Sequence, residues 1–210
     1  MRWLVWSAVA ACIVQLPLAL VVAPEAANFN APLTQRIFYY HVPAAWVAYL
    51  AFAVTAVASA LVLWREDARA DRLAAASAEV GLVFGTIALV TGLVWATQEF
   101  FGYSALEDPK VITLGVLLAA YFSYFTLRSN VDEDKRARLS AVFGLLCVLG
   151  VPLSYLASRA SIHPDFTRPE ESLDWRLGLI LLYSTVAFTL LYAALVSMRV
   201  RLMRMEEGQR

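Results

Sequence analysis

Residues 37–64, IFYYHVPAAWVAYLAFAVTAVASALVLW, form a run of 28 residues between Arg36 and Arg65 without a charged side chain. A helix of about 20 apolar residues crosses the hydrocarbon core of a bilayer, so this run is long enough to span it. The bilayer core offers the backbone no hydrogen-bond partners, so only helices and closed barrels can cross it. Barrel strands are about 10 residues long and alternate in polarity, which this run does not do. The stretch therefore predicts a transmembrane helix.

Five further uncharged runs of similar length occur along the chain. They lie between Arg2 and Glu25, Glu79 and Glu99, Lys110 and Arg128, Arg138 and Arg159, and Arg176 and Arg199. We therefore predict an all-α fold, an integral membrane bundle of six transmembrane helices that forms a single domain over residues 1–210. The predicted spans cover residues 3–24, 42–64, 79–98, 111–127, 139–158 and 177–198.

The composition of the chain agrees with a membrane protein and excludes several other classes. Hydrophobic residues make up 60% of the chain and charged residues 16%, whereas soluble domains are about 45–50% apolar and about 25% charged. The 17 basic residues balance 17 acidic ones, so the chain has no basic field that would attract a nucleic acid. It also has no Gly-rich phosphate loop, which argues against an ATPase.

The distribution of Lys and Arg predicts the orientation of the bundle. With six spans both termini lie on one side, and 12 of the 17 basic residues fall on that side. The positive-inside rule therefore places both termini in the cytoplasm. The segment from Met1 to Val22 is expected to be a retained anchor, because it is long for a signal peptide and its loss would leave five spans. The cytoplasmic links, residues 65–72 and 128–138, are expected to be solvated connectors without a motif.

The sequence contains two histidines, and both are predicted at the outer ends of spans. His41 opens the second span, with Pro43 expected to start that helix, and His163 follows the fifth span. Imidazole is a common metal ligand and an axial ligand of haem. Two histidines at one membrane depth could bind one iron from opposite faces. Histidines that merely lie in the headgroup layer would occupy the same positions, so position alone leaves both interpretations open.

The two cysteines do not form a comparable pair. Cys12 and Cys147 fall within the first and fifth spans. They are expected to be small apolar side chains of transmembrane helices. Because they do not form a CxxC motif, the sequence argues against a thiol–disulfide transporter of the usual two-cysteine design.

The third span contains small residues at intervals, among them Gly85, Ala88 and Gly92. Small residues allow transmembrane helices to approach one another closely, so this span is expected to pack tightly. Trp95 follows them near the predicted outer interface, where tryptophan is enriched.

The outer loop after the third span is rich in aromatic residues. Phe100, Phe101 and Tyr103 could lie on the membrane surface or stack against a flat apolar ring. The pair Asp108–Pro109 predicts the start of the fourth helix, with Asp at the N-cap and Pro at the first helical position.

Three segments resemble the cytochrome c maturation protein C family, also called haem exporter protein C. Residues 35–46, QRIFYYHVPAAW, resemble the signature before the second span of that family. Residues 91–95, TGLVW, resemble the end of its third span. Residues 151–155, VPLSY, followed by His163-Pro164, resemble its segment from the fifth span to the second histidine. The resemblance covers nearly the whole chain.

The resemblance implies a haem-handling protein of the inner membrane that acts in cytochrome c biogenesis by binding rather than by enzymatic turnover. It implies haem b, bound transiently at the outer, periplasmic face and passed to a membrane-anchored haem chaperone. The implied partners are also an ABC transporter and a small single-span protein. His41 and His163 would be the axial ligands of the iron. Further haem contacts would come from Trp95, Phe101, Gly102, Tyr103 and Asp108.

The chain departs from the family in its outer loop. The family loop reads roughly WGxxWxWDPR, whereas residues 101–110 here read FGYSALEDPK. Gly, Asp and Pro are retained, but no tryptophan remains. The tryptophans usual before the second histidine are also replaced, by SRAS at residues 158–161.

Two alternatives therefore stay open. The first is a membrane transport or structural subunit without a cofactor. A transporter would be expected to carry charges within its spans, and only Glu79 comes near one. The second is a membrane haem redox subunit, which would usually need four histidines at two depths.

Overall fold

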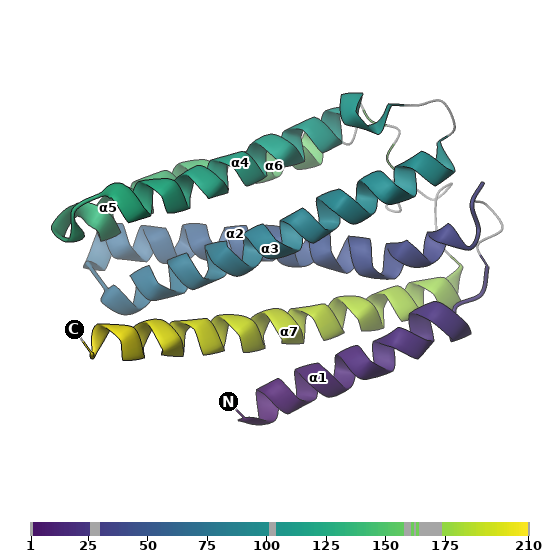
Figure 1. The fold of residues 1–210 in the computed structure, drawn as a ribbon, viewed down its shortest axis with the longest axis horizontal. Helices are drawn as coiled ribbons and strands as arrows, with labels where there is room; N and C mark the ends of the chain where they lie inside the picture. The colour runs from purple at the N-terminus through teal and green to yellow at the C-terminus, as the bar shows by residue number, and fades with distance from the viewer. Residues whose placement is uncertain are drawn as a thin grey trace.

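The computed structural model describes residues 2–25, 30–100, 104–157, 161, 163 and 174–209. All regular elements in these ranges are helical, and Figure 1 shows them running side by side with both chain ends at the same end of the bundle. The elements are α1 Arg2–Pro17, the π-helical η1 Leu18–Val22, the 3-10 helix η2 Thr34–Ile37, α2 Phe38–Arg65, α3 Ala68–Glu99, the 3-10 helix η3 Ala105–Glu107, α4 Pro109–Asn130, α5 Glu133–Cys147, α6 Gly150–Ala157 and α7 Trp175–Glu207.

Six helical segments in the described part of the chain are long and apolar enough to cross a membrane, which confirms the predicted fold. Several are longer than the predicted spans. The 32 residues of α3 correspond to about 48 Å at about 1.5 Å per residue, against a hydrocarbon core of about 30 Å. The prediction began this span at residue 79, but the helix begins at Ala68, where Asp67 caps it by accepting from the Arg69 N–H at 2.8 Å. The apolar run determines which residues cross the membrane, whereas the N-cap determines where the helix begins.

The core of the bundle is centred on α2, which packs against α3, α5 and α7, while α1 packs against α7. Small residues bring the helices close together. A Cβ at Gly85 would lie 2.5 Å from the Leu118 side chain, so the predicted close packing at this glycine is confirmed. In the middle of the core the rings of Phe52 and Tyr121 stack with their centroids 3.8 Å apart.

The start of the second span differs from the prediction. The chain is already helical from Thr34, and α2 begins at Phe38, so Pro43 lies inside the helix rather than at its start. Proline has no N–H to donate to the carbonyl four residues earlier, which is that of Tyr39. The side chain of Gln15 in α1 donates to this carbonyl instead, at 2.9 Å. A buried polar side chain of α1 thus satisfies the carbonyl that Pro43 leaves without its usual donor in α2.

The fifth span is divided into α5 and α6, which a single predicted span of residues 139–158 did not anticipate. Pro152 cannot donate to the carbonyl of Val148. That carbonyl accepts from the N–H of Val151 at 2.9 Å, which tightens the chain locally. The proline therefore accounts for the break.

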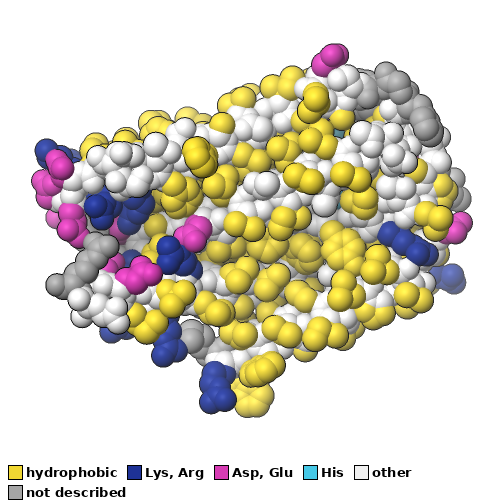
Figure 2. All heavy atoms as spheres, in the orientation of Figure 1, with side chains coloured by type: hydrophobic (Ala, Val, Ile, Leu, Met, Phe, Trp, Pro, Cys, Tyr) yellow, Lys and Arg dark blue, Asp and Glu magenta, His cyan; other side chains and the backbone are white. Residues whose placement is uncertain are grey.

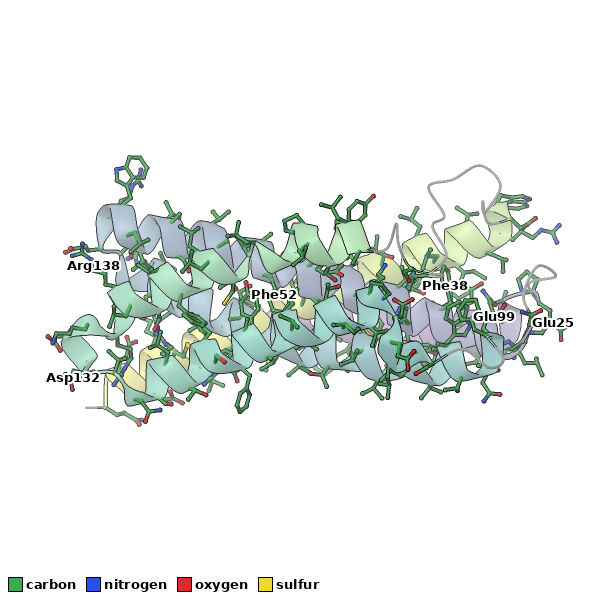
Figure 3. The ribbon with its side chains drawn as sticks, turned by 90° about the horizontal axis from the view of Figure 1, so that it is seen from above. Glu25, Phe38, Phe52, Glu99, Asp132 and Arg138 are labelled. Carbon is green, nitrogen blue, oxygen red and sulfur yellow. The ribbon has the colours of Figure 1, made fainter. Side chains whose placement is uncertain are left out.

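Charged side chains gather at the end of the bundle that carries the termini, and an apolar surface covers the middle (Figure 2). Several of these charges join helices. Arg128 of α4 binds both carboxylate oxygens of Asp71 in α3. Arg199 of α7 binds Glu79 of α3 at 2.7 Å. Figure 3 shows this end at Asp132 and Arg138, and the opposite end at Glu99.

Candidate functional site

The structure brings the two histidines together at the end of the bundle opposite the termini. Their ring centroids are 6.1 Å apart, and their planes are inclined by 39°. His41 projects from the first turn of α2, whereas His163 belongs to the connection between α6 and α7. Residues 122 positions apart in the sequence therefore face one another.

The ring of His41 is oriented by α3. Its Nδ1 lies 2.9 Å from the carbonyl oxygen of Ala88 and 3.2 Å from Oγ1 of Thr91. Because a carbonyl oxygen can only accept, Nδ1 carries the proton and donates it. The lone pair of the imidazole is then on Nε2. A hydrogen bond of this kind fixes the tautomer and the ring orientation of metal-binding histidines.

Gly92 makes room for this ring. A Cβ at this position would lie 2.7 Å from Cε1 and 3.2 Å from Nδ1 of His41. The sequence predicted that Gly92 serves helix packing, and the structure gives it a narrower task. It allows the imidazole to approach the backbone of α3.

His163 is held through the start of α4. Its backbone N–H donates to Oγ of Ser161 at 2.9 Å, and this hydroxyl donates to Oδ2 of Asp108 at 2.6 Å. The other carboxylate oxygen of Asp108 caps α4 by accepting from the N–H groups of Lys110 and Val111. The predicted N-cap is confirmed, and the same carboxylate also anchors the second histidine.

The ring of His163 has a different neighbour from that of His41. Nζ of Lys110 lies 3.4 Å from its Nδ1. A lysine ammonium has donors only, so Nδ1 of His163 accepts this contact. In a neutral ring the proton is then on Nε2, which is the opposite tautomer to that of His41.

Of the other predicted haem contacts, the structure describes Trp95 and Asp108. Trp95 is buried, with 7% of its surface exposed, and it meets the Phe100 ring edge-on at a centroid distance of 5.4 Å. Asp108 is also buried and is engaged as described above. Phe101, Gly102 and Tyr103 lie outside the described residues.

Sequence reasoning missed Glu99, whose buried carboxylate binds the connection between η1 and η2 to the end of α3. Its two oxygens accept from the backbone N–H groups of Asn30 and Ala31 at 2.9 and 3.0 Å. The side chain of Asn30 donates in turn to the carbonyl of Glu99 at 3.0 Å. A single acidic residue after an apolar span usually marks the place where the chain enters water, so nothing in the sequence indicated these hydrogen bonds.

Comparison with known proteins identifies the family of the chain. A family model described as Heme exporter protein C matches residues 1–210. Heme exporter protein C of Escherichia coli is 32% identical over 178 residues, covering 83% of this chain and 72% of the relative. The proteins of that name from Rhodobacter capsulatus and Bradyrhizobium diazoefficiens are 29% and 30% identical. These two matches span 95% and 97% of this chain, and 84% and 80% of the length of the relatives. The chain therefore belongs to the heme exporter protein C family.

Proposed function

We propose that this chain binds haem b between His41 and His163 at the outer face of the membrane and passes it on during cytochrome c biogenesis. Family membership supports the general role in haem handling. The histidine pair supports the specific mode of binding.

The spacing of the two rings is the observation that carries the proposal. A bond between a metal and an imidazole nitrogen is about 2.0–2.1 Å long, and the ring centre lies about 1.1 Å beyond that nitrogen. Two imidazoles on opposite sides of one metal would therefore have centroids roughly 6.3 Å apart. The observed distance is 6.1 Å. Two ligands suffice when the metal brings its other ligands with it, as haem iron does.

The hydrogen bonds of the two rings are compatible with binding of a haem iron. His41 offers the lone pair of Nε2, because Nδ1 donates to the Ala88 carbonyl. His163 would supply the second ligand after Lys110 leaves Nδ1 and the ring proton moves from Nε2 to that nitrogen. Haem held by two histidines has no open iron position, so oxygen would not be activated during transfer. The proposed role is binding and transfer, without enzymatic turnover.

The proposed location follows from the orientation of the bundle. The histidines lie at the end opposite the termini, and the positive-inside rule places the termini in the cytoplasm. We infer a multi-pass protein of the inner membrane whose haem site faces outward. The proposed recipient is a membrane-anchored haem chaperone, with the subunits of an ABC transporter and a small single-span protein as further partners.

The test compares single variants of the full chain, purified in detergent and titrated with haem b. The wild type is expected to show a Soret band and the low-spin spectrum of iron with two nitrogen ligands. His41→Ala and His163→Ala should each lower the haem affinity at least tenfold, since each removes one iron ligand. Ser104→Ala, an exposed change at the same end, is the matched control. A variant of either histidine that keeps the wild-type spectrum and affinity would refute the assignment.

Transfer is tested with the same proteins. Haem-loaded wild type, mixed with the haem-free chaperone, is expected to lose its Soret absorbance as the chaperone gains it. If the loaded chain keeps its haem in the presence of excess chaperone, the proposed recipient is wrong while the histidine assignment stands.

A further inference from the structure

A second candidate site is a groove at the end of the bundle that carries the termini. This open groove of about 570 Å³ runs between α3, α4, α5 and α7. Its charged lining residues are Arg128, Arg136, Arg199 and Glu79. The first two arginines belong to residues 128–138, which were expected to form a connector without a motif.

The three arginines differ in how they are engaged. Arg128 is bound by Asp71, and Nε of Arg199 by Glu79 at 2.7 Å. Nε of Arg136 is buried, and it has no hydrogen-bond partner within the described part of the chain. A charged donor without a protein acceptor is unfavourable. Because Arg136 lines the groove, its guanidinium is the group there that an anionic ligand could bind.

The uncharged part of the groove is mainly apolar, with Thr126 and Ser129 as its polar residues. Phe122, Phe125 and Met203 form part of its wall, and 66% of the Phe122 surface is exposed. The groove also lies where α3 and α7 pass out of the apolar belt into the charged end seen in Figure 2. A ligand that fits it has an anionic acceptor group joined to an apolar chain.

We propose that this groove binds one anionic phospholipid from the leaflet on the side of the termini. Its phosphodiester accepts from the guanidinium of Arg136, and an acyl chain lies against Phe122 and Phe125. Guanidinium groups recognise phosphate oxygens well, and basic pockets between transmembrane helices bind anionic headgroups. This inference goes beyond the proposed function, because the groove and the histidine pair lie at opposite ends of the bundle.

Two other anions are less suited to the groove. Free phosphate would leave the aromatic wall unused. The carboxylates of haem would suit the arginines, but the described lining contains no imidazole for the iron. Both become outcomes of the test.

The test uses native mass spectrometry of the full chain in detergent, titrated with dioleoylphosphatidylglycerol. Arg136→Gln is expected to weaken binding about tenfold, as for loss of a hydrogen bond to a charged group. Arg138→Gln, an exposed change on the same helix, should stay within about twofold of wild type if the binding is site-specific rather than a general surface attraction. Dioleoylphosphatidylcholine should bind the wild type about tenfold more weakly, because its headgroup has no net charge.

A steric pair keeps the test independent of charge and of the folding of the arginine variant. Thr126→Trp places a bulky ring in the groove and should block the lipid, whereas Ser123→Trp on the same helix lies outside the groove lining and should not. The proposal is overturned if Arg136→Gln or Thr126→Trp binds like wild type, or if both arginine variants weaken equally. It is also overturned if the two lipids bind alike, if millimolar inorganic phosphate displaces the lipid, or if haem displaces it with an affinity that depends on Arg136.

Discussion

The two histidines of the candidate haem site are supported in opposite ways. His41 stands on a long helix, and its ring is fixed by the backbone of the neighbouring helix. His163 lies in a connection, and its backbone is tied through one hydroxyl to the cap of α4. His41 carries its proton on Nδ1, the nitrogen away from the proposed iron. In His163 the corresponding nitrogen, Nδ1, accepts from Lys110 instead.

This contrast gives the two ligands different tasks under the proposed function. A ligand held by two packed helices is ready before haem arrives. A ligand in a connection can exchange its partners as haem arrives and leaves. A protein that must release its cargo benefits from one ligand of each kind.

Gly92→Val is expected to have the largest effect, because it acts on the preset side of the pair. The added side chain would occupy the space of the His41 ring. Disturbing the groups that orient a metal ligand typically lowers affinity about 10–100-fold, and we expect a loss in this range in haem titrations. Gly115→Val is the control, since a Cβ there meets no atom within 4 Å. Equal affinities for the two variants would show that the His41 ring need not stay where it is.

Ser161→Ala tests the adjustable side. It removes the hydroxyl that joins His163 to Asp108. Loss of a net hydrogen bond of about 1 kcal/mol corresponds to roughly fivefold weaker haem binding. The loss should appear mainly as faster haem dissociation, measured by transfer to excess apomyoglobin. Ser161→Thr keeps the hydroxyl and should restore most of the affinity; if it behaves like Ser161→Ala, the hydroxyl is not the relevant group.

Lys110→Met tests whether the lysine competes with iron for His163. Removing the donor frees Nδ1 and lets the proton move away from Nε2. We expect haem affinity to rise by about threefold, somewhat less than a full net hydrogen bond would give. Lys135→Met, at the other end of the bundle, is the control. A fall in affinity would instead mean that Lys110 binds the haem carboxylates.

Gln15→Leu is expected to have the smallest effect. It removes the donor to the Tyr39 carbonyl and puts an apolar side chain of similar size in place of the amide. Hydrogen bonds between transmembrane helices contribute about 0.6 kcal/mol on average, so the thermal midpoint in detergent should fall by only a few degrees. Gln98→Leu, an exposed position, should leave it unchanged. A loss of haem affinity as large as that of Gly92→Val would place the first helix inside the haem site.

The sequence was sufficient for the number of spans because bilayer thickness acts on every apolar run in the same way. It was insufficient where prolines act within a helix. Pro43 suggested a helix start and Pro152 gave no signal, yet one removes a hydrogen bond inside α2 and the other divides the fifth span. The outcome in each case depends on which neighbouring group satisfies the freed carbonyl, and that neighbour is distant in the sequence.

The candidate site shows the same division. The positions of the two histidines at the ends of spans opposite the termini could be predicted, and so could the cap at Asp108. The roles of Ser161 and Glu99 could not, because a serine two residues before a histidine and an acid at the end of a span are common. Their contacts join segments 53 and 69 residues apart, so only the packed chain reveals them.

The hydrogen bond between Gln15 and Tyr39 also bears on biosynthesis. During synthesis α1 enters the bilayer before α2, and the amide of Gln15 then lies in hydrocarbon without its acceptor on α2, which is unfavourable. The free carbonyl created by Pro43 arrives with the next helix to be inserted. The two groups satisfy one another as soon as α1 and α2 meet, before α7 has been made. We therefore expect the first helical hairpin to assemble early, so that the turn carrying His41 is set in place before the rest of the bundle closes around it.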